Sequence, residues 1–183
     1  KGRDFKAAAL IDLSTVADIE ISNPPWVKFQ SAGWVNFPSA PTHRLVIQRL
    51  KEAVPALRQV GIEADFKSVK QLREFPTPAA YVLLAEETGD PKPTGNSTGA
   101  ARQRVGALFG VVLAVRSYRY DQLADAADDL RSILDQVRGA LVGWVPDLPL
   151  ARGVQFVTGK VLDSDDTTLL WGEIYTTQHS IGR

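Results

Sequence analysis

The chain of 183 residues suits one folded domain with room for an appendage, and its 44% hydrophobic and 23% charged residues are ordinary for a protein with a soluble surface. Its 21 lysines and arginines equal its 21 aspartates and glutamates. The net charge is therefore zero, which argues against general nucleic-acid binding through a basic excess. The absence of cysteine excludes disulfides, thiolate metal sites and cysteine nucleophiles.

The first residues of the chain and its apolar runs bear on localisation. No apolar run is long enough to cross a membrane, and the first residues contain no clear secretion signal, so we expect no membrane partner. The sequence has no methionine, even at position 1. We therefore expect the N-terminus to be trimmed or the chain to be part of a longer product.

Residues 1–42 differ in composition from the rest. The stretch NPPWVKFQSAGWVNFPSAPT contains four prolines, two phenylalanines and the tryptophans Trp26 and Trp34. Proline interrupts regular helix, and aromatic rings favour burial. We expect an N-terminal arm that packs either on its own domain or on a neighbouring subunit, and a folded domain over residues 43–183.

The first regular elements of the domain follow this arm. Apolar residues at three- and four-residue spacing predict a helix that begins at Thr42 as its N-cap and is limited by Pro55. The stretch LRQVGI, residues 57–62, predicts a short strand. Residues 65–75 predict a short helix with Asp65 as a candidate cap.

Two apolar runs predict strands over residues 79–85, AAYVLLA, and 105–117, VGALFGVVLAVRS. The second run is apolar on both faces, which is typical of a central strand covered on both sides or of a strand in a subunit interface. Residues 86–104 between them are rich in glycine and proline, which indicates a long hairpin loop.

The C-terminal half predicts one helix and one hairpin. An apolar stripe with alternating four- and three-residue steps predicts a helix over 121–144, with Gly143 at its end. The runs GVQFVTGKVL and TTLLWGEIYTTQ predict two strands joined by the turn DSDD. The expected fold is α+β: an antiparallel β-sheet with a long helix and shorter helices packed on one face.

A search for catalytic or binding chemistry finds little. His43 and His179 lack the spacing of a metal motif, so we expect surface or interface side chains. There is no G-x-S-x-G nucleophile motif, the DSDD stretch fails the calcium-loop register, and TGNSTGAAR lacks the lysine of a phosphate loop. We expect no catalytic residue, no metal and no cofactor.

The charge pattern is more informative. Four basic residues and no acid lie within positions 100–120: Arg102, Arg104, Arg116 and Arg119. The helix that follows is acidic on its outer face, with Asp125, Asp128 and Asp129. Two interpretations remain: ordinary solvated surface, or complementary patches that bind copies of the same chain head to tail.

An ordered set of stretches resembles the tail terminator proteins of tailed bacteriophages. These are RLKEAVPALRQVG, PAAYVLLAEE, RQRVGALFGVVLAVRSYRYD, the helix AADDLRSILDQVRGALVGWVPD with its Leu-x-Gly-Trp-x-Pro end, and LLWGEIYTT. The resemblance runs from Arg44 to about Gln178. No single stretch is diagnostic, because the likeness is an order of elements. We recognise no counterpart of residues 1–41 in the family.

The resemblance implies a structural virion protein and not an enzyme. Such proteins form a six-fold ring on the head-proximal end of the tail tube, end its polymerisation, and join the tail to the head connector or stopper protein in the neck. The implied partners are copies of the same chain, the tail tube protein and the connector. DNA would pass through the lumen without sequence-specific binding. The protein would be assembled in the host cytoplasm, for a tail that is either contractile or non-contractile.

The hairpin loop is the part that we expect to reach an adjacent ring or subunit. Its charged residues Glu86, Glu87, Asp90 and Lys92 join Arg102, Arg104, Arg116, Arg119, Asp125, Asp128, Asp129, Trp26 and Trp34 as candidate interface residues. Two alternatives remain. One is another phage neck protein, such as a head-completion or stopper protein, and the other is a small α+β ligand-binding or hydrolase domain.

Overall fold

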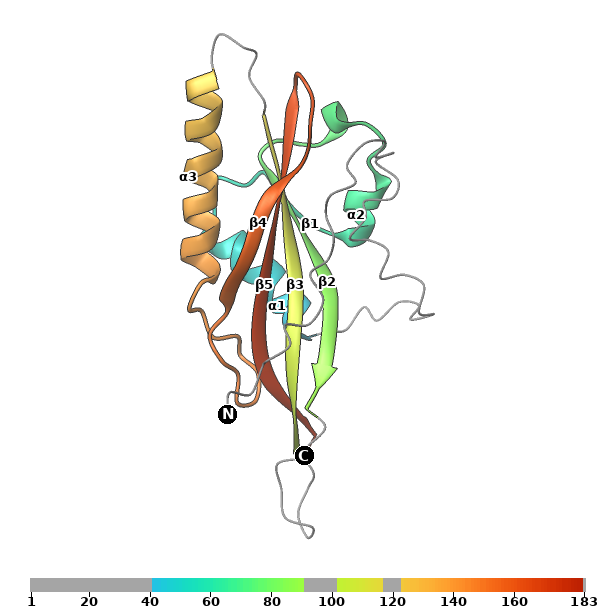
Figure 1. The fold of residues 1–183 in the computed structure, drawn as a ribbon, viewed down its shortest axis with the longest axis vertical. Coiled ribbons are helices and arrows are strands. Elements are labelled where there is room, and N and C mark those ends of the chain that lie inside the picture. Colours follow the sequence, from blue (N-terminus) through green and yellow to red (C-terminus); the bar gives the residue numbers. More distant parts are fainter. Residues whose placement is uncertain (1–40, 91–101, 117–122, 183) are drawn as a thin grey trace, which may run out of the picture. The chain divides into compact units, whose positions relative to one another are not determined.

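The computed structural model describes residues 41–90, 102–116 and 123–182, with the backbone alone for 123–128. The expected arm therefore lies outside the described residues, except for its last two. The elements, labelled in Figure 1, are α1 (Pro41–Ala53), β1 (Gln59–Ile62), α2 (Glu63–Ser68), the short 3-10 helix η2 (Leu72–Glu74), β2 (Ala79–Gly89), β3 (Arg102–Arg116), α3 (Leu123–Leu141), β4 (Gln155–Ser164) and β5 (Thr168–Gly182).

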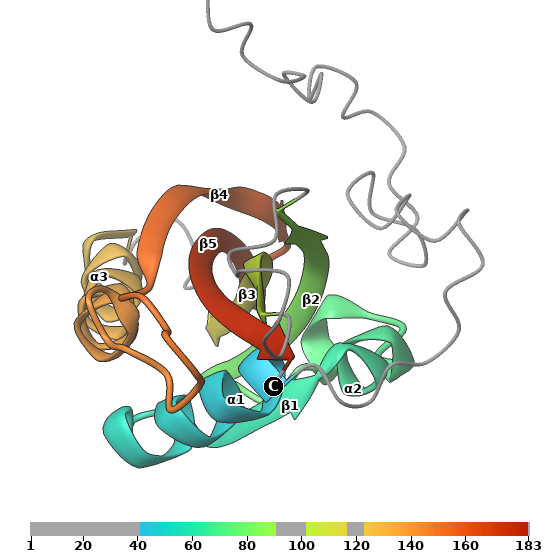
Figure 2. The same ribbon diagram turned by 90° about the horizontal axis from the view of Figure 1, so that it is seen from below.

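The five strands form one sheet in the order β1-β2-β3-β5-β4, which Figure 2 shows nearly end-on. Neighbours pair antiparallel except β1 and β2, which are parallel. The α+β class is thus supported, but the expected sheet without parallel strands is wrong. A parallel pair needs a crossover, and here α2 and η2 form it. The sequence showed these elements but not the direction in which the chain returns.

Helices lie on both faces of the sheet, which corrects the expectation of one covered face. On one face, Val46 and Leu50 of α1 and Val137 of α3 pack with alternate residues of the strands, such as Val82 and Val111. The intervening residues of the strands point to the other face. There Tyr81 of β2 packs against Phe66 of α2 and Phe75, with ring centroids 5.7 and 5.5 Å apart.

Strand β3 is central, as its two apolar faces predict. It pairs with β5 over its whole length, from Arg102 opposite Gly182 to Arg116 opposite Thr168. This long partner extends the hairpin beyond its apolar part. Glu86 to Gly89 belong to β2, and Arg102 to Arg104 belong to β3. The expected loop over 86–104 is therefore shorter, and residues 91–101 of it lie outside the described residues.

The helix ends differ in detail from the expectation. Pro41 lies within α1, where its fixed φ suits the first turn. Thr42 is not a cap, because its buried hydroxyl finds no hydrogen-bond partner in the described part of the chain. The helix expected over 65–75 is two shorter elements, α2 and η2. Asp65 lies inside α2 and not at the cap position, which is Ile62, but its Oδ2 accepts a hydrogen bond from the Ile62 N–H at 2.8 Å. At the far end of α3, Gly143 has φ +80°, the left-handed conformation expected after a helix.

The predicted C-terminal hairpin is confirmed as β4 and β5, joined by a turn around Asp165. The Oδ1 atom of Asp165 accepts hydrogen bonds from the Thr167 and Thr168 N–H groups at 2.7 and 2.8 Å. Desolvation alone would raise the pKa of this carboxyl, but the hydrogen bonds from Thr167 and Thr168 outweigh it and lower the pKa. The DSDD stretch is thus a hairpin turn that the Asp165 carboxylate stabilises.

Candidate interaction surfaces

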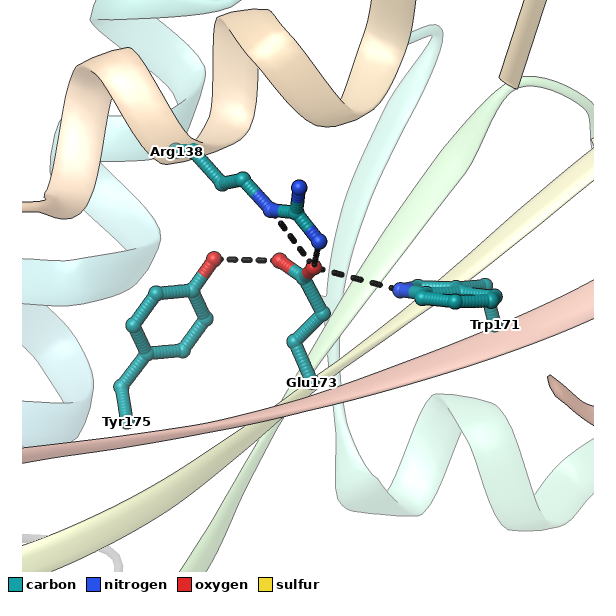
Figure 3. A network of polar contacts seen from close by, with 4 residues as sticks. All are labelled: Arg138, Trp171, Glu173 and Tyr175. Atoms are coloured by element: carbon teal, nitrogen blue, oxygen red, sulfur yellow. Dashed lines mark hydrogen bonds and ion pairs between the residues drawn. The ribbon is translucent and has the colours of Figure 1, made fainter. Parts of the chain in front are cut away.

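The strongest polar cluster in the described residues surrounds Glu173 of β5, whose side chain is 0% exposed (Figure 3). Its Oε1 accepts hydrogen bonds from Arg138 Nε at 2.9 Å, from an Arg138 terminal nitrogen at 2.6 Å, and from Trp171 Nε1 at 3.2 Å. Its Oε2 accepts a hydrogen bond from the Tyr175 hydroxyl. Both oxygens of a buried carboxylate are therefore satisfied by one charged and two neutral donors.

The cluster joins three elements. Arg138 comes from α3, and Trp171, Glu173 and Tyr175 lie on the same face of β5. In β4, Gly159 lies opposite Glu173, and a Cβ atom there would come within 3.2 Å of both Glu173 Oε1 and the Trp171 ring. The missing side chain at Gly159 leaves room for the carboxylate and the Trp171 ring beside β4.

The electrostatics of the cluster keep Arg138 charged and Tyr175 neutral. The hydrogen bonds to Glu173 raise the pKa of the Arg138 guanidinium, against the opposing effect of partial desolvation. Burial, and then the hydrogen bond to Glu173, raise the pKa of the Tyr175 phenol well above its usual range. A carboxylate that is closed to solvent and already accepts four hydrogen bonds has no access for a substrate. We interpret the cluster as a structural anchor of α3 on the sheet.

Sequence analysis did not single out this cluster. A signal was present in the run WGEIY. Glu173 lies between Trp171 and Tyr175, and the alternation of a predicted strand places all three on the same, inward face. A charge at such a position needs a buried partner. The partner is 35 residues away on another element, which the periodicity of one strand does not reveal.

The acidic and basic candidates at the hairpin lie on neighbouring strands, with Glu86 opposite Leu108 and therefore four residues along β3 from Arg104. Glu86 and Glu87 are exposed in β2, and Arg102 and Arg104 are exposed in β3. The Asp90 N–H donates a hydrogen bond to the Arg104 carbonyl oxygen at 2.7 Å, which closes this end of the strand pair.

Other candidates are separated from this group or lie outside it. Arg116 is exposed at the opposite end of β3, about 46 Å from Arg102 for an extended strand of this length. Asp129 is exposed on α3, while Asp125 and Asp128 lie in the same helix at positions where only the backbone is described. The remaining candidates lie outside the described residues: Lys92, Arg119, Trp26 and Trp34.

Only one of the two histidines contradicts the expectation of a surface or interface side chain. His179 of β5 is 2% exposed and therefore not a surface side chain, because alternation along β5 points it to the same face as Tyr175. Its Nδ1 finds no hydrogen-bond partner in the described part of the chain. His43 is half-buried, and its Nε2 donates a hydrogen bond to the Val82 carbonyl oxygen at 2.9 Å.

Exposed apolar side chains gather on strand β4. Phe156 is 41% exposed, Val157 52% and Val161 49%. Phe156 has two ordered neighbours: the centroid of its ring lies 5.8 Å from that of Tyr175 and 5.1 Å from the Arg138 guanidinium carbon. An ordered aromatic ring on an outer strand is typical of a contact surface.

No group of three or more potential metal-ligating side chains occurs within residues 41–90, 102–116 and 123–182. Among the same residues, no helix is long and apolar enough to span a membrane.

The fold and its surfaces define a class: an α+β domain whose ordered polar cluster is closed to solvent and whose exposed features suit contacts with other proteins. The sequence profile of the family described as "Phage tail terminator protein" matches residues 39–183. The match covers most of the chain, and the protein belongs to this family. It is a structural protein of a phage tail, found in the virion, and not an enzyme.

Among solved structures, one described as "Virion of native gene transfer agent (GTA) particle" contains a similar chain. The two chains are 16% identical, with a TM-score of 0.46. The match covers 80% of this chain and 100% of the other. No curated protein sequence matches the chain.

Proposed function

We propose that the protein forms a six-fold ring on the head-proximal end of the tail tube. The ring ends polymerisation of the tube and provides the surface that the head connector or stopper protein binds. The observation that carries this proposal is membership of the tail terminator family over the entire described domain. A head-to-tail contact whose rotation closes produces a ring, and a bound ring covers the surface to which the next tube subunit would add.

The proposed partners follow from this position in the neck. Copies of the chain form the ring, the tail tube protein binds one face, and the connector binds the other. DNA passes through the lumen without sequence-specific contacts, which agrees with a net charge of zero. Assembly takes place in the host cytoplasm.

Electron microscopy of particles made without this protein tests the proposal. We expect tails of excessive and variable length, because nothing stops addition to the tube, and we expect heads without attached tails. Tails of normal length beside heads that have lost DNA would instead indicate a stopper protein and overturn the proposal. A strictly monomeric protein that binds a small molecule and is absent from purified tails would overturn it as well.

A further inference from the structure

The sheet has two open edges within the described residues. Strand β4 has β5 as a neighbour on one side only. Strand β2 is covered by β1 over Ala79–Val82, and beyond this stretch only β3 accompanies it. Open edges expose unpaired backbone groups, which proteins usually protect or cover with another chain.

The two edges carry opposite charges. On the β2 edge, Glu86 and Glu87 are exposed, and β2 contains no lysine or arginine. On the β4 edge, Arg152 is exposed just before the strand, and Lys160 lies within it. The Arg138 side chain, 38% exposed, lies over Phe156 at the same place. The acid of β4, Asp163, lies at the other end of the strand beside the turn.

The opposite charges lie at the same height in the sheet. The residue pairing leads from Glu86 across Leu108 of β3 and Thr176 of β5 to Gln155 at the start of β4. In the adjacent row, Glu87 leads to Thr177, whose hydroxyl donates a hydrogen bond to the Arg152 carbonyl oxygen at 2.6 Å. A second copy placed beside the first without a shift along the strands would bring acid to base.

Strand direction also suits such a contact. Three successive antiparallel pairings separate β2 from β4, so that the two edge strands run in opposite directions. A neighbouring copy rotated about an axis roughly parallel to the strands would continue the antiparallel order. Bulges interrupt β2 between Leu84 and Glu86 and β4 between Phe156 and Thr158. Side chains, with Phe156 and Val157 among them, therefore carry more of the contact than a long backbone ladder does.

We propose that the β2 edge of one copy, at Glu86 and Glu87, contacts the start of β4 on the next copy, at Arg152, Phe156 and Arg138. Each copy uses two different edges, so the contact is head to tail, as a closed ring of identical copies requires. The charge complementarity selects a second copy of this chain as the occupant of both edges. The inference rests on the proposed ring and adds which surfaces form it.

A charge exchange tests the contact. One variant is Glu86→Arg/Glu87→Arg, and the other is Arg152→Glu/Gln155→Glu. All four side chains are exposed, so folding should be unaffected, which thermal unfolding checks. We expect each variant alone to lose at least nine-tenths of the ring-sized species in light scattering. An equimolar mixture should recover it, because rings of alternating variants restore opposite charges at every contact. Arg44→Glu on the exposed side of α1 is the control and should form rings normally.

Cross-linking provides an independent readout. The chain contains no cysteine, so Glu86→Cys/Gln155→Cys introduces the only thiols. Oxidation of this double variant on assembled tails should give cross-linked products of increasing size, up to all the subunits of one ring. Glu86→Cys alone should give no such series of products.

The outcomes separate the two proposals. If the wild type forms rings and both charge variants still do so, or the mixture of variants fails to recover them, the edge contact is wrong while the ring function stands. If the wild type forms no ring, either in solution or on tail tubes, the edge contact and the proposed function both fail.

Discussion

At the scale of single residues, Glu173 and Arg138 form an asymmetric pair. Glu173 is wholly buried, while Arg138 reaches solvent at one side. Removal of the arginine leaves an uncompensated charge in the core, whereas removal of the carboxylate charge leaves an arginine that can turn toward water. Loss of one partner of a buried ion pair is usually far more costly than joint replacement of both by apolar residues.

We predict that Arg138→Met lowers the free energy of unfolding by about 3 kcal/mol, and that Glu173→Gln lowers it by about 1–2 kcal/mol. Urea unfolding at neutral pH measures both. Arg44→Met, which removes an exposed helical arginine, is the control and should change little. If Glu173→Gln lowered the free energy of unfolding as much as Arg138→Met or more, a buried carboxylate left without its arginine would not be the main cost of breaking the pair.

The phenol of Tyr175 predicts how stability depends on alkaline pH. Burial raises its pKa in the folded protein, so that above about pH 10 the unfolded chain releases this proton while the folded protein keeps it. The stability is therefore complete below pH 10 and falls as the pH rises further.

We expect the unfolding free energy of the wild type to fall more steeply above pH 10 than that of Tyr175→Phe. The difference in slope is up to about 1.4 kcal/mol per pH unit, which corresponds to one proton. Tyr81, whose pKa is also raised by burial and by Asp65, leaves a residual slope in the variant. Identical slopes would mean that Tyr175 ionises equally in both states.

At the scale of elements, two glycines at the C-terminal end of α3, one within the helix and one beyond it, have opposite roles. Gly139 lies inside the helix, while Gly143 lies beyond its end at φ +80°. An added Cβ would meet no atom within 4 Å at either position. Packing is thus the same for both, and backbone conformation alone distinguishes them.

We predict that Gly139→Ala raises the unfolding free energy by about 0.5–1 kcal/mol, because alanine loses less conformational entropy in a helix. Gly143→Ala should lower it by about 1 kcal/mol, because a Cβ is unfavourable in the left-handed conformation. Thermal or urea unfolding of both variants checks the two signs. The same sign for both would show that the helix does not end as described.

At the scale of the whole molecule, the hairpin between β2 and β3 bears on assembly. Its described base is closed by the bond from Asp90 to Arg104 and by the Gln103 side chain, which donates to the Asp90 carbonyl oxygen at 2.9 Å. A deletion that retains Asp90 therefore leaves the strand pairing intact.

We predict that deletion of residues 91–98 changes the unfolding free energy by less than about 1 kcal/mol, because loop-closure entropy depends weakly on length. Tail completion should nevertheless fall severely, as measured by infectious particles and by tail length. Replacement of the same residues by glycine and serine at equal length separates reach from side-chain contacts. Normal particles from the deletion variant would refute a contact role for this segment.

The sequence alone determined most of the segments that become helix and strand and their order along the chain, although the helix predicted over 65–75 is two elements, α2 and η2. Periodicity is local, so the apolar runs that form β2 and β3 and the stripe that forms α3 were readable without a structure. The same order of elements indicated the family. Only tertiary structure decided that β1 is parallel to β2, that helices cover both faces, and that Glu173 finds Arg138. These features depend on where distant segments meet. The same is true of the two oppositely charged edges, because only the strand register places the acids of β2 level with the start of β4.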